Sequence, residues 1–310
     1  MNMKIGVNGS GLVQKGSVQA ITDDVVMAEQ QGFEHYWLAE HPTGGLDALT
    51  TLALVGARTS HIELGTAVVP TFPRHPMTLA GQALTVADAV GKRLTLGIGL
   101  SHEPMMDQLG LSFEKPIRHL TEYLKILTPL LRTGEVDFKG ELLSCTGKLF
   151  QKPKTSVSVL VAALGPQALA VAGKWADGTT LAWVGSKTVA EHIVPRLSAA
   201  AAENDRPTPR VVATLPVCVT DQPDVVRASI ARRLSLYGSL PSYKEMFRRE
   251  GVSGPSDVAI IGARDEVSDR IAALFEAGIT DFAPSEYCLN AGERAATRDL
   301  LIELIKQEAG

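Results

Sequence analysis

Short apolar runs rich in β-branched residues alternate along this chain with segments whose apolar residues recur at helical spacing. Such runs, bounded by Gly and Pro, are typical of parallel strands buried on both faces. The runs predicted as strands are Lys4–Asn8, Glu34–Ala39, Ile62–Val69, Arg93–Ile98, Val157–Ala163, Thr179–Trp183, Val211–Val219 and Thr280–Pro284. The segments predicted as helices are Val18–Gln31, Ala48–Arg58, Pro76–Ala89, Ile117–Leu131, Pro166–Ala176, Val189–Ala202 and Glu266–Glu276. This alternation fits a closed (β/α)8 TIM barrel better than an open doubly wound sheet.

The spacing of the strands locates two insertions. Most predicted strands begin about 30 residues apart, the length of one β-α unit. The interval after the fourth strand holds Thr133–Lys154, predicted as a small polar excursion, and the interval after the seventh holds Leu236–Ala259, predicted to add a helix and a short strand. No linker or low-complexity segment interrupts the pattern, so we predict a single domain over residues 1–310.

Composition excludes several classes of protein. Of the 310 residues, 45% are apolar and 21% charged, the net charge is −4, and the 30 Lys and Arg are spread along the chain, which is not the footprint of a nucleic-acid-binding protein. The apolar runs are too short for a membrane span, and no signal-peptide pattern precedes the first strand. No cysteine or histidine cluster has metal-ligand spacing. We therefore expect a cytoplasmic protein without a metal.

Function in such a barrel is expected at the C-terminal ends of the strands. The second strand runs into Glu40 and His41, a pair suited either to acid–base work or to fixing a loop by a hydrogen bond. Gly97 and Gly99 in the fourth strand would let a flat ligand approach the backbone. His102 follows them and is placed to donate a proton.

Other strand ends carry candidate anion contacts. Arg74 and His75 follow the third strand, as anion contacts or as a solvated helix start. The segment Gly165-Pro166-Gln167 opens a helix and would leave free N–H groups at its positive end. Ser186 and Lys187 open the next helix, and together these two helix starts suggest a phosphate site. Gly6, Gly9 and Gly11 have the order G-x-x-G-x-G, which favours a turn over a dinucleotide fingerprint.

Taken in order, the motifs resemble a known family. They are Trp37-Leu38-Ala39-Glu40-His41, Leu64-Gly65-Thr66-Ala67-Val68, Arg74-His75-Pro76, the segment from Gly91 to Gly99, Leu164-Gly165-Pro166-Gln167, and the segment from Ala172 to Gly178. This set is similar to the bacterial-luciferase-like oxidoreductases and spans nearly the whole chain. Arg74-His75-Pro76, the ending Gly97-Ile98-Gly99-Leu100-Ser101-His102 and Leu240-Pro241-Ser242-Tyr243 resemble the branch that uses coenzyme F420.

The resemblance implies a deazaflavin ring in the barrel mouth, with a phosphate and a glutamate-bearing tail. A non-proline cis peptide after the third strand would correspond to Ala67–Val68. The family's acidic residue corresponds to Glu40 and its neighbouring histidine to His41, whereas His102 stands where related enzymes often have an acid. The implied coenzyme contacts are Ala67, Val68, Gly99, Leu100, Ser101, Ala163, Leu164, Gly165, Pro166, Gln167, Ser186 and Lys187. The basic residues Arg227, Arg232, Arg233, Lys244, Arg248 and Arg249 would receive the tail or form a solvated helix face.

These observations predict an F420-dependent oxidoreductase that transfers hydride to or from a small organic substrate, with His102, His41 or Glu40 in acid–base roles. The alternatives are an FMN-dependent monooxygenase of the same family and a non-catalytic flavin or deazaflavin carrier. Aromatic and sulfur side chains near the mouth suggest an apolar or conjugated substrate: Phe72, Met105, Met106, Tyr237 and Tyr243. By analogy with the family, we expect a homodimer.

Overall fold

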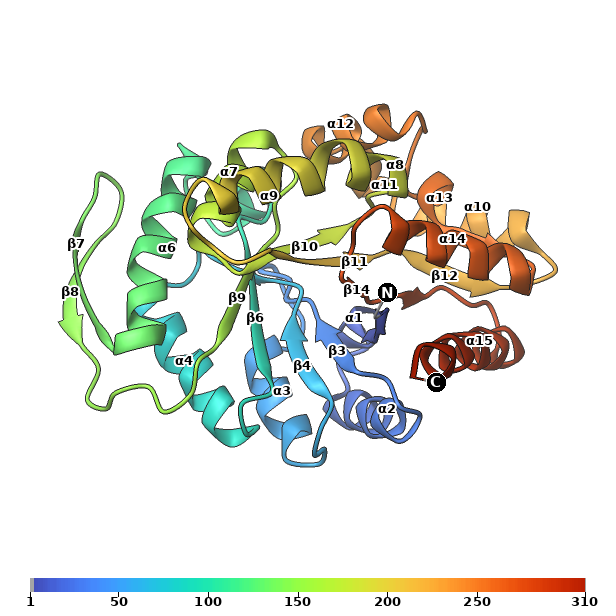
Figure 1. Cartoon of the computed structure of the whole chain (residues 1–310), viewed down its shortest axis with the longest axis horizontal. Coiled ribbons are helices and arrows are strands. Elements are labelled where there is room, and N and C mark those ends of the chain that lie inside the picture. Colours follow the sequence, from blue (N-terminus) through green and yellow to red (C-terminus); the bar gives the residue numbers. More distant parts are fainter. Residues whose placement is uncertain (1–2, 310) are drawn as a thin grey trace.

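The computed structural model of the chain describes residues 3–309. At its centre a parallel sheet of ten strands closes on itself, because its end strands β1 and β2 are two pieces of the first predicted strand. Gly6 joins them, and its amide donates to the carbonyl of Phe282 (2.9 Å). The strands are β1 (Lys4–Ile5), β2 (Val7–Asn8), β3 (His35–Leu38), β4 (Glu63–Thr66), β5 (Val69–Pro70), β6 (Leu94–Gly99), β9 (Ser158–Val161), β10 (Gly178–Ala182), β11 (Arg210–Thr214) and β14 (Asp281–Phe282). The predicted TIM barrel is confirmed, with its first and third strands each split in two (Figure 1).

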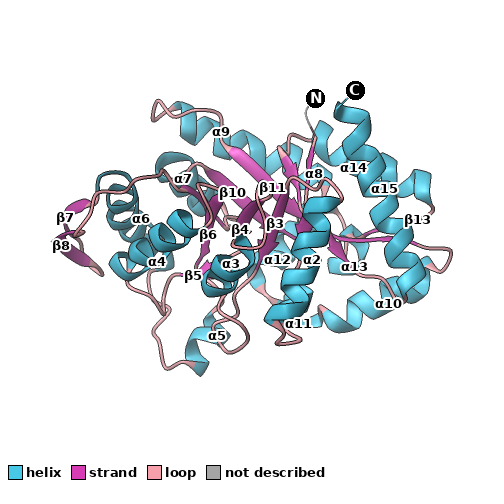
Figure 2. Ribbon diagram, turned by 90° about the horizontal axis from the view of Figure 1, so that it is seen from below, coloured by secondary structure: helices cyan, strands magenta, loops and turns pink. Residues whose placement is uncertain are grey.

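Helices follow the strands and cover the outside of the barrel (Figure 2). They are α1 (Ser10–Val13), α2 (Val18–Gln30), α3 (Ala48–Gly56), α4 (Pro76–Ala89), α5 (Glu103–Gln108), α6 (Pro116–Thr133), α7 (Pro166–Trp175), α8 (Ser186–Thr188), α9 (Val194–Ala202), α10 (Pro223–Arg233), α14 (Arg264–Glu276) and α15 (Ala291–Ala309). Every predicted helix is present, although the one predicted from Val189 begins with a π-helical turn, η1 (Val189–Ile193). The last helix, α15, has no counterpart among the predictions.

Both insertions are present, and one is more elaborate than predicted. Thr133–Lys154 forms an antiparallel hairpin, β7 (Glu135–Lys139) and β8 (Ser144–Lys148), which lies on the far side of α6 from the barrel (Figure 1). The segment Leu236–Ala259 contains three short helices where one was predicted: α11 (Ser235–Ser239), α12 (Pro241–Glu250) and α13 (Pro255–Val258). Its expected short strand follows as β13 (Ile260–Gly262).

The seventh predicted strand serves two sheets. Its first part is β11 in the barrel, and after Leu215 it continues as β12 (Pro216–Val219). There it pairs in parallel with β13 on one side and with β15 (Ser285–Glu286), the continuation of the eighth strand, on the other. This small second sheet attaches the helices from α10 through α14 to the barrel, beside the C-terminal ends of the barrel strands.

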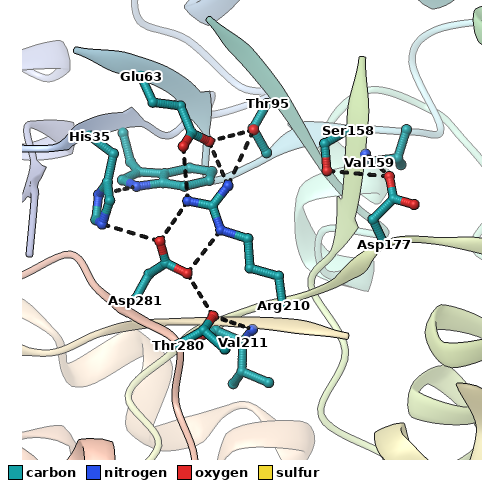
Figure 3. Close-up of polar contacts among 11 residues, drawn as sticks. His35, Glu63, Thr95, Ser158, Val159, Asp177, Arg210, Val211, Thr280 and Asp281 are labelled. Carbon is teal, nitrogen blue, oxygen red and sulfur yellow. Dashed lines mark hydrogen bonds and ion pairs between the residues drawn. The ribbon is translucent and has the colours of Figure 1, made fainter. Parts of the chain in front are cut away.

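Side chains fill the barrel up to the level where function is expected. At the N-terminal ends of the strands, Arg210 binds the carboxylates of Glu63 (Nη1–Oε1, 2.6 Å) and Asp281 (Nη2–Oδ1, 2.6 Å), as Figure 3 shows. One level higher, Trp37 packs against Val212 and other apolar residues and is fully buried. Gly65 leaves room for it, because a Cβ there would lie 2.2 Å from the indole ring. The barrel is thus closed below and can hold a ligand only above Trp37.

Candidate active site

A cavity of about 500 Å³ opens at the C-terminal ends of the barrel strands. It exists because the inward side chains at this level are small: Asn8, Ala162, Ala182 and Thr214 line it where Trp37 fills the level below. Asn8 is held in place by its neighbours, since its Nδ2 donates to Thr214 (3.3 Å) and its Oδ1 accepts from the amide of Ser10 (3.0 Å). The lining residues are Asn8, Ala67, Val68, Gly99, Leu100, Ser101, His102, Glu103, Pro104, Phe113, Pro116, Ala162, Leu164, Gly165, Ala168, Thr180, Leu181, Ala182, Thr214, Leu240, Pro241, Ser242 and Tyr243.

One wall of the cavity is the bulge Ala67–Val68, whose peptide bond is cis, as the family resemblance implied. The amide of Ala67 donates to the carbonyl of Leu38 (2.8 Å), and the amide of Glu40 donates to the carbonyl of Val68 (3.2 Å). These hydrogen bonds tie the bulge to the end of β3. The side chain of Val68 therefore presents a fixed apolar surface to the cavity.

The glycines of β6 make room for this bulge, which differs from the role we expected. A Cβ at Gly97 would lie 1.9 Å from the carbonyl oxygen of Thr66, and a Cβ at Gly99 would lie 2.6 Å from Cγ2 of Val68. The space above both glycines is thus filled by the chain itself. A ligand meets Val68 there, and only Gly99 of the two also lines the cavity.

The N-terminus of α7 also faces the cavity. Its first intrahelical hydrogen bond runs from the amide of Leu169 to the carbonyl of Gly165 (3.0 Å). The amides of Gln167 and Ala168 precede it and have no acceptor within the helix. Leu164, Gly165 and Ala168 line the cavity. This end of α7 can therefore bind an anion through backbone N–H groups.

His192 fixes the loop that leads into α7. Its Nε2 donates to the carbonyl of Leu164 (2.8 Å), and its Nδ1 accepts from Nε of Arg196 (2.9 Å). Burial lowers the pKa of His192, so the imidazole stays neutral and keeps this pair of roles. Nearby, Ala163 is buried, while Pro166 and Gln167 are exposed and do not line the cavity.

The helix that begins at Ser186 already has an anion at its N-terminus. The carboxylate of Glu250 accepts from the amides of Lys187 (3.2 Å) and Thr188 (2.8 Å) and from the Thr188 hydroxyl (2.6 Å). Ser186 and Glu250 line a smaller, separate cavity of about 140 Å³. The structure thus does not bring Ser186 and Lys187 together with Gly165 around one ligand.

His102 is the histidine that reaches the cavity. It follows Ser101, whose φ of 63° is unusual for a residue other than glycine, and it precedes α5. Its ring lies among aromatic rings of the second insertion, with centroids 5.8 Å from Tyr243 and 6.3 Å from Tyr237. Burial lowers the pKa of His102, so its imidazole is neutral at pH 7 and can accept a proton.

Glu40 and His41 lie beside the cavity and do not line it. Glu40 forms an ion pair with Arg74, which also binds Asp47, and it accepts from the amide of Ala48 (3.2 Å). Arg74 is thus engaged by carboxylates of the chain. His75 is exposed and caps α4 by accepting from the amide of Met77 (3.2 Å).

The aromatic residues predicted near the mouth divide into two groups. Tyr243 lines the cavity, and Tyr237 packs behind it with a centroid distance of 5.6 Å. Phe72 instead stacks on the ring of His119 (3.9 Å), and its neighbour Phe113 lines the cavity. Four of the basic residues considered for the coenzyme's tail have partners within the chain: Arg248 and Arg249 bind Glu245, while on α10 Arg227 donates to a backbone carbonyl and Arg233 lies over Tyr287.

A family model described as luciferase-like monooxygenase matches residues 3–281. The chain belongs to the luciferase-like monooxygenase family. This confirms the resemblance seen in the sequence motifs. Among the described residues 3–309, no group of three or more His, Cys, Asp or Glu could hold a metal ion, and no helix is long and apolar enough to cross a membrane.

Relatives within the family support the assignment along most of the chain. A 5,10-methylenetetrahydromethanopterin reductase of Methanolobus tindarius is 26% identical over 274 residues, which cover 88% of this chain and 83% of the relative. An F420-dependent glucose-6-phosphate dehydrogenase of Beutenbergia cavernae is 29% identical over 246 residues, covering 75% and 72%. A solved F420-dependent secondary alcohol dehydrogenase, in complex with an F420-acetone adduct, superposes with a TM-score of 0.81 at 20% identity and covers 99% of both chains. That likeness shows the luciferase-like barrel fold.

Several cavity residues escaped the sequence analysis. Asn8, Thr180 and Thr214 point inward from ordinary strand positions and contribute the polar atoms of the floor. Their only signal is the alternation of inward and outward side chains, which places each of them on the inner face near a strand end. Glu103 was also missed, because a carboxylate in the first turn of a helix is unremarkable in sequence.

Proposed function

We propose that this protein is an F420-dependent oxidoreductase that transfers hydride between the coenzyme and a small organic substrate. The observation that carries the proposal is the cavity above Trp37, whose wall includes both the apolar Ala67–Val68 bulge and the N-terminus of α7. A flat ring with an anionic arm matches both features. The family relatives named as F420-dependent give the proposal independent support.

The residues present fit this coenzyme. We expect the ring to lie against Val68 and Ala67, and the phosphate to accept hydrogen bonds from the amides of Gln167 and Ala168. His192 would keep that anion site rigid through its hydrogen bond to Leu164. When bound, the deazaflavin would supply the carbon that gives or takes the hydride, while the protein orients the two partners.

His102 is the proposed acid–base residue. It lines the cavity and its partly buried imidazole is neutral at pH 7, so it can take a proton from a substrate hydroxyl or, once protonated, return one to a carbonyl. Glu40 is proposed to position the bulge, because its amide holds Val68 and its carboxylate is engaged by Arg74. His41 is partly buried beside the cavity and is the alternative proton carrier.

Two expectations of the sequence analysis extend this proposal. We propose that the protein acts in the cytoplasm and pairs as a homodimer. Sedimentation equilibrium tests the second of these, and a monomer at micromolar concentration would refute it.

Turnover tests the proposed activity. Purified protein is mixed with reduced F420 and a panel of ketones and enones, or with oxidised F420 and a panel of alcohols, and the coenzyme's absorbance is followed. Substrate-dependent oxidation or reduction of F420 is the expected result. Turnover that requires reduced FMN and oxygen, and never F420, would instead make the protein a monooxygenase. Tight F420 binding without turnover on any panel would make it a carrier.

A further inference from the structure

The cavity is lined without a single cationic side chain. Among the described residues that form its wall, Glu103 is the one carboxylate, and no Lys or Arg is present. Apart from Glu103, the outer wall is apolar or uncharged and includes Leu100, Phe113, Leu240 and Tyr243. The mouth of the barrel therefore has negative rather than positive charge to offer a ligand.

Three cationic residues near the mouth form ion pairs with carboxylates of the chain. Arg74 binds the carboxylates of Glu40 and Asp47. Lys115 and Arg118, at the start of α6, both bind Glu141 of the β7–β8 hairpin. A substrate anion would have to break an ion pair to bind any of these three.

Two helix N-termini supply positive potential at the cavity: that of α12, whose residues Pro241, Ser242 and Tyr243 line it, and the anion site at α7. The α7 amides at Gln167 and Ala168 lie on the side of the cavity assigned above to the coenzyme's phosphate. With the coenzyme bound, they would be occupied. An anionic substrate would then lose its hydration in the cavity without gaining a cationic side chain as its partner, and the negative charge of Glu103 would repel it.

We propose that the substrate is an uncharged organic compound with an apolar body and one alcohol or carbonyl group, and that Glu103 is the residue that rejects anions. This inference rests on the proposed function, because it assumes that coenzyme and substrate share the cavity. In the oxidative direction His102 would take the hydroxyl proton while the substrate carbon would give its hydride to bound oxidised F420, which would leave a neutral carbonyl product. A sugar phosphate, named as the substrate of one relative, has no charge partner here.

A matched pair of ketones tests the inference by binding rather than by turnover. Cyclohexanone is compared with its derivative that carries a carboxylate group on the ring carbon opposite the carbonyl carbon. Saturation-transfer NMR and calorimetry measure their binding to the protein with and without oxidised F420. The variants are Glu103→Gln, which removes the charge, and Asp107→Asn on the same helix, which removes a charge from an exposed position outside the cavity lining.

The neutral ketone should bind the coenzyme-loaded wild type about tenfold or more tightly than its carboxylate. Glu103→Gln should narrow that ratio to about threefold, whereas Asp107→Asn should leave it unchanged. Equal or tighter binding of the carboxylate to the wild type would overturn the proposal. So would a ratio that Glu103→Gln does not alter, or no binding of either ketone at millimolar concentration. A failure to bind F420 at all would instead refute the proposed function.

Discussion

The guanidinium of Arg210 reaches across the N-terminal end of the barrel to the carboxylate of Asp281, with Nη2 2.6 Å from Oδ1. Asp281 is 1% exposed, and Arg210 also binds Glu63. Burial acts to raise the pKa of Asp281, but the hydrogen bond and charge of Arg210 hold it below its ordinary value. The carboxylate thus stays charged because Arg210 is present, and the pair closes the barrel beneath Trp37.

Removing Arg210 should destabilise the protein strongly. Arg210→Met would leave the carboxylates of Glu63 and Asp281 without their cation, and the free energy of unfolding should fall by about 3–5 kcal/mol. Arg248→Met is the control, because Arg248 pairs with Glu245 on the exposed face of α12. Loss of this ion pair should cause no measurable change in the free energy of unfolding. Urea denaturation at pH 7 measures both. An Arg210→Met protein as stable as the control would show that the network is not needed to keep the barrel folded.

His119 should make stability depend on pH. Its ring stacks on Phe72 and its Nε2 lies 3.1 Å from the Thr71 hydroxyl, and burial lowers its pKa from 6.5 to about 4. Between pH 6.5 and about pH 4 the unfolded chain binds a proton at His119 that the folded chain does not, so the free energy of unfolding falls as the pH drops. The loss attributable to His119 should be about 3 kcal/mol over the window. His119→Phe should flatten the pH profile of urea denaturation, and an unchanged slope would exclude His119 as its source.

Replacement by alanine should change stability differently at Gly97 and Gly99 of β6 and at Gly165, which precedes α7. Gly97→Ala would place Cβ 1.9 Å from a backbone carbonyl oxygen and should cost about 3 kcal/mol or more of unfolding free energy. Gly99→Ala meets a side-chain methyl of Val68 at 2.6 Å rather than a backbone atom, so a smaller loss of stability should accompany weaker F420 binding. Gly165→Ala has open space and a φ of −77°, and its stability should match the wild type. Comparable losses in Gly97→Ala and Gly165→Ala would contradict this packing.

Replacing His102 should separate chemistry from binding. In His102→Gln, kcat should fall by about 10²–10⁴, while the affinity for F420 stays within about threefold. Burial lowers the pKa of His102 from the ordinary histidine value of 6.5. As the pH is lowered, the wild-type rate of alcohol oxidation should therefore begin to decline only below pH 6.5. Stopped-flow kinetics over a range of pH measures kcat and its pH dependence in the wild type and in His102→Gln, and His41→Gln is measured for comparison. A collapse of F420 affinity with kcat retained would assign His102 to binding.

The fold was largely predictable because it depends on periodicity, whereas the site depends on contacts between distant segments. Apolar runs with β-branched residues, such as those of β6 and β9, indicate buried parallel strands without any knowledge of which segments pack against them. The anion at the start of the helix Ser186–Thr188 was not predictable, since Glu250, which accepts from the amide of Thr188, lies 62 positions further along the chain in the second insertion. The role of Gly97 likewise follows from the Thr66 carbonyl of another strand. The bulge at Ala67–Val68 was expected only through the family resemblance.

The most direct test of the account is an equilibrium titration of the purified protein with F420 and, in parallel, with FMN, followed by fluorescence. The account predicts saturable binding of one F420 per chain, with an affinity for F420 well above that for FMN, and competition by inorganic phosphate at the N-terminus of α7. Binding of FMN in preference to F420, or no binding of either, would contradict it.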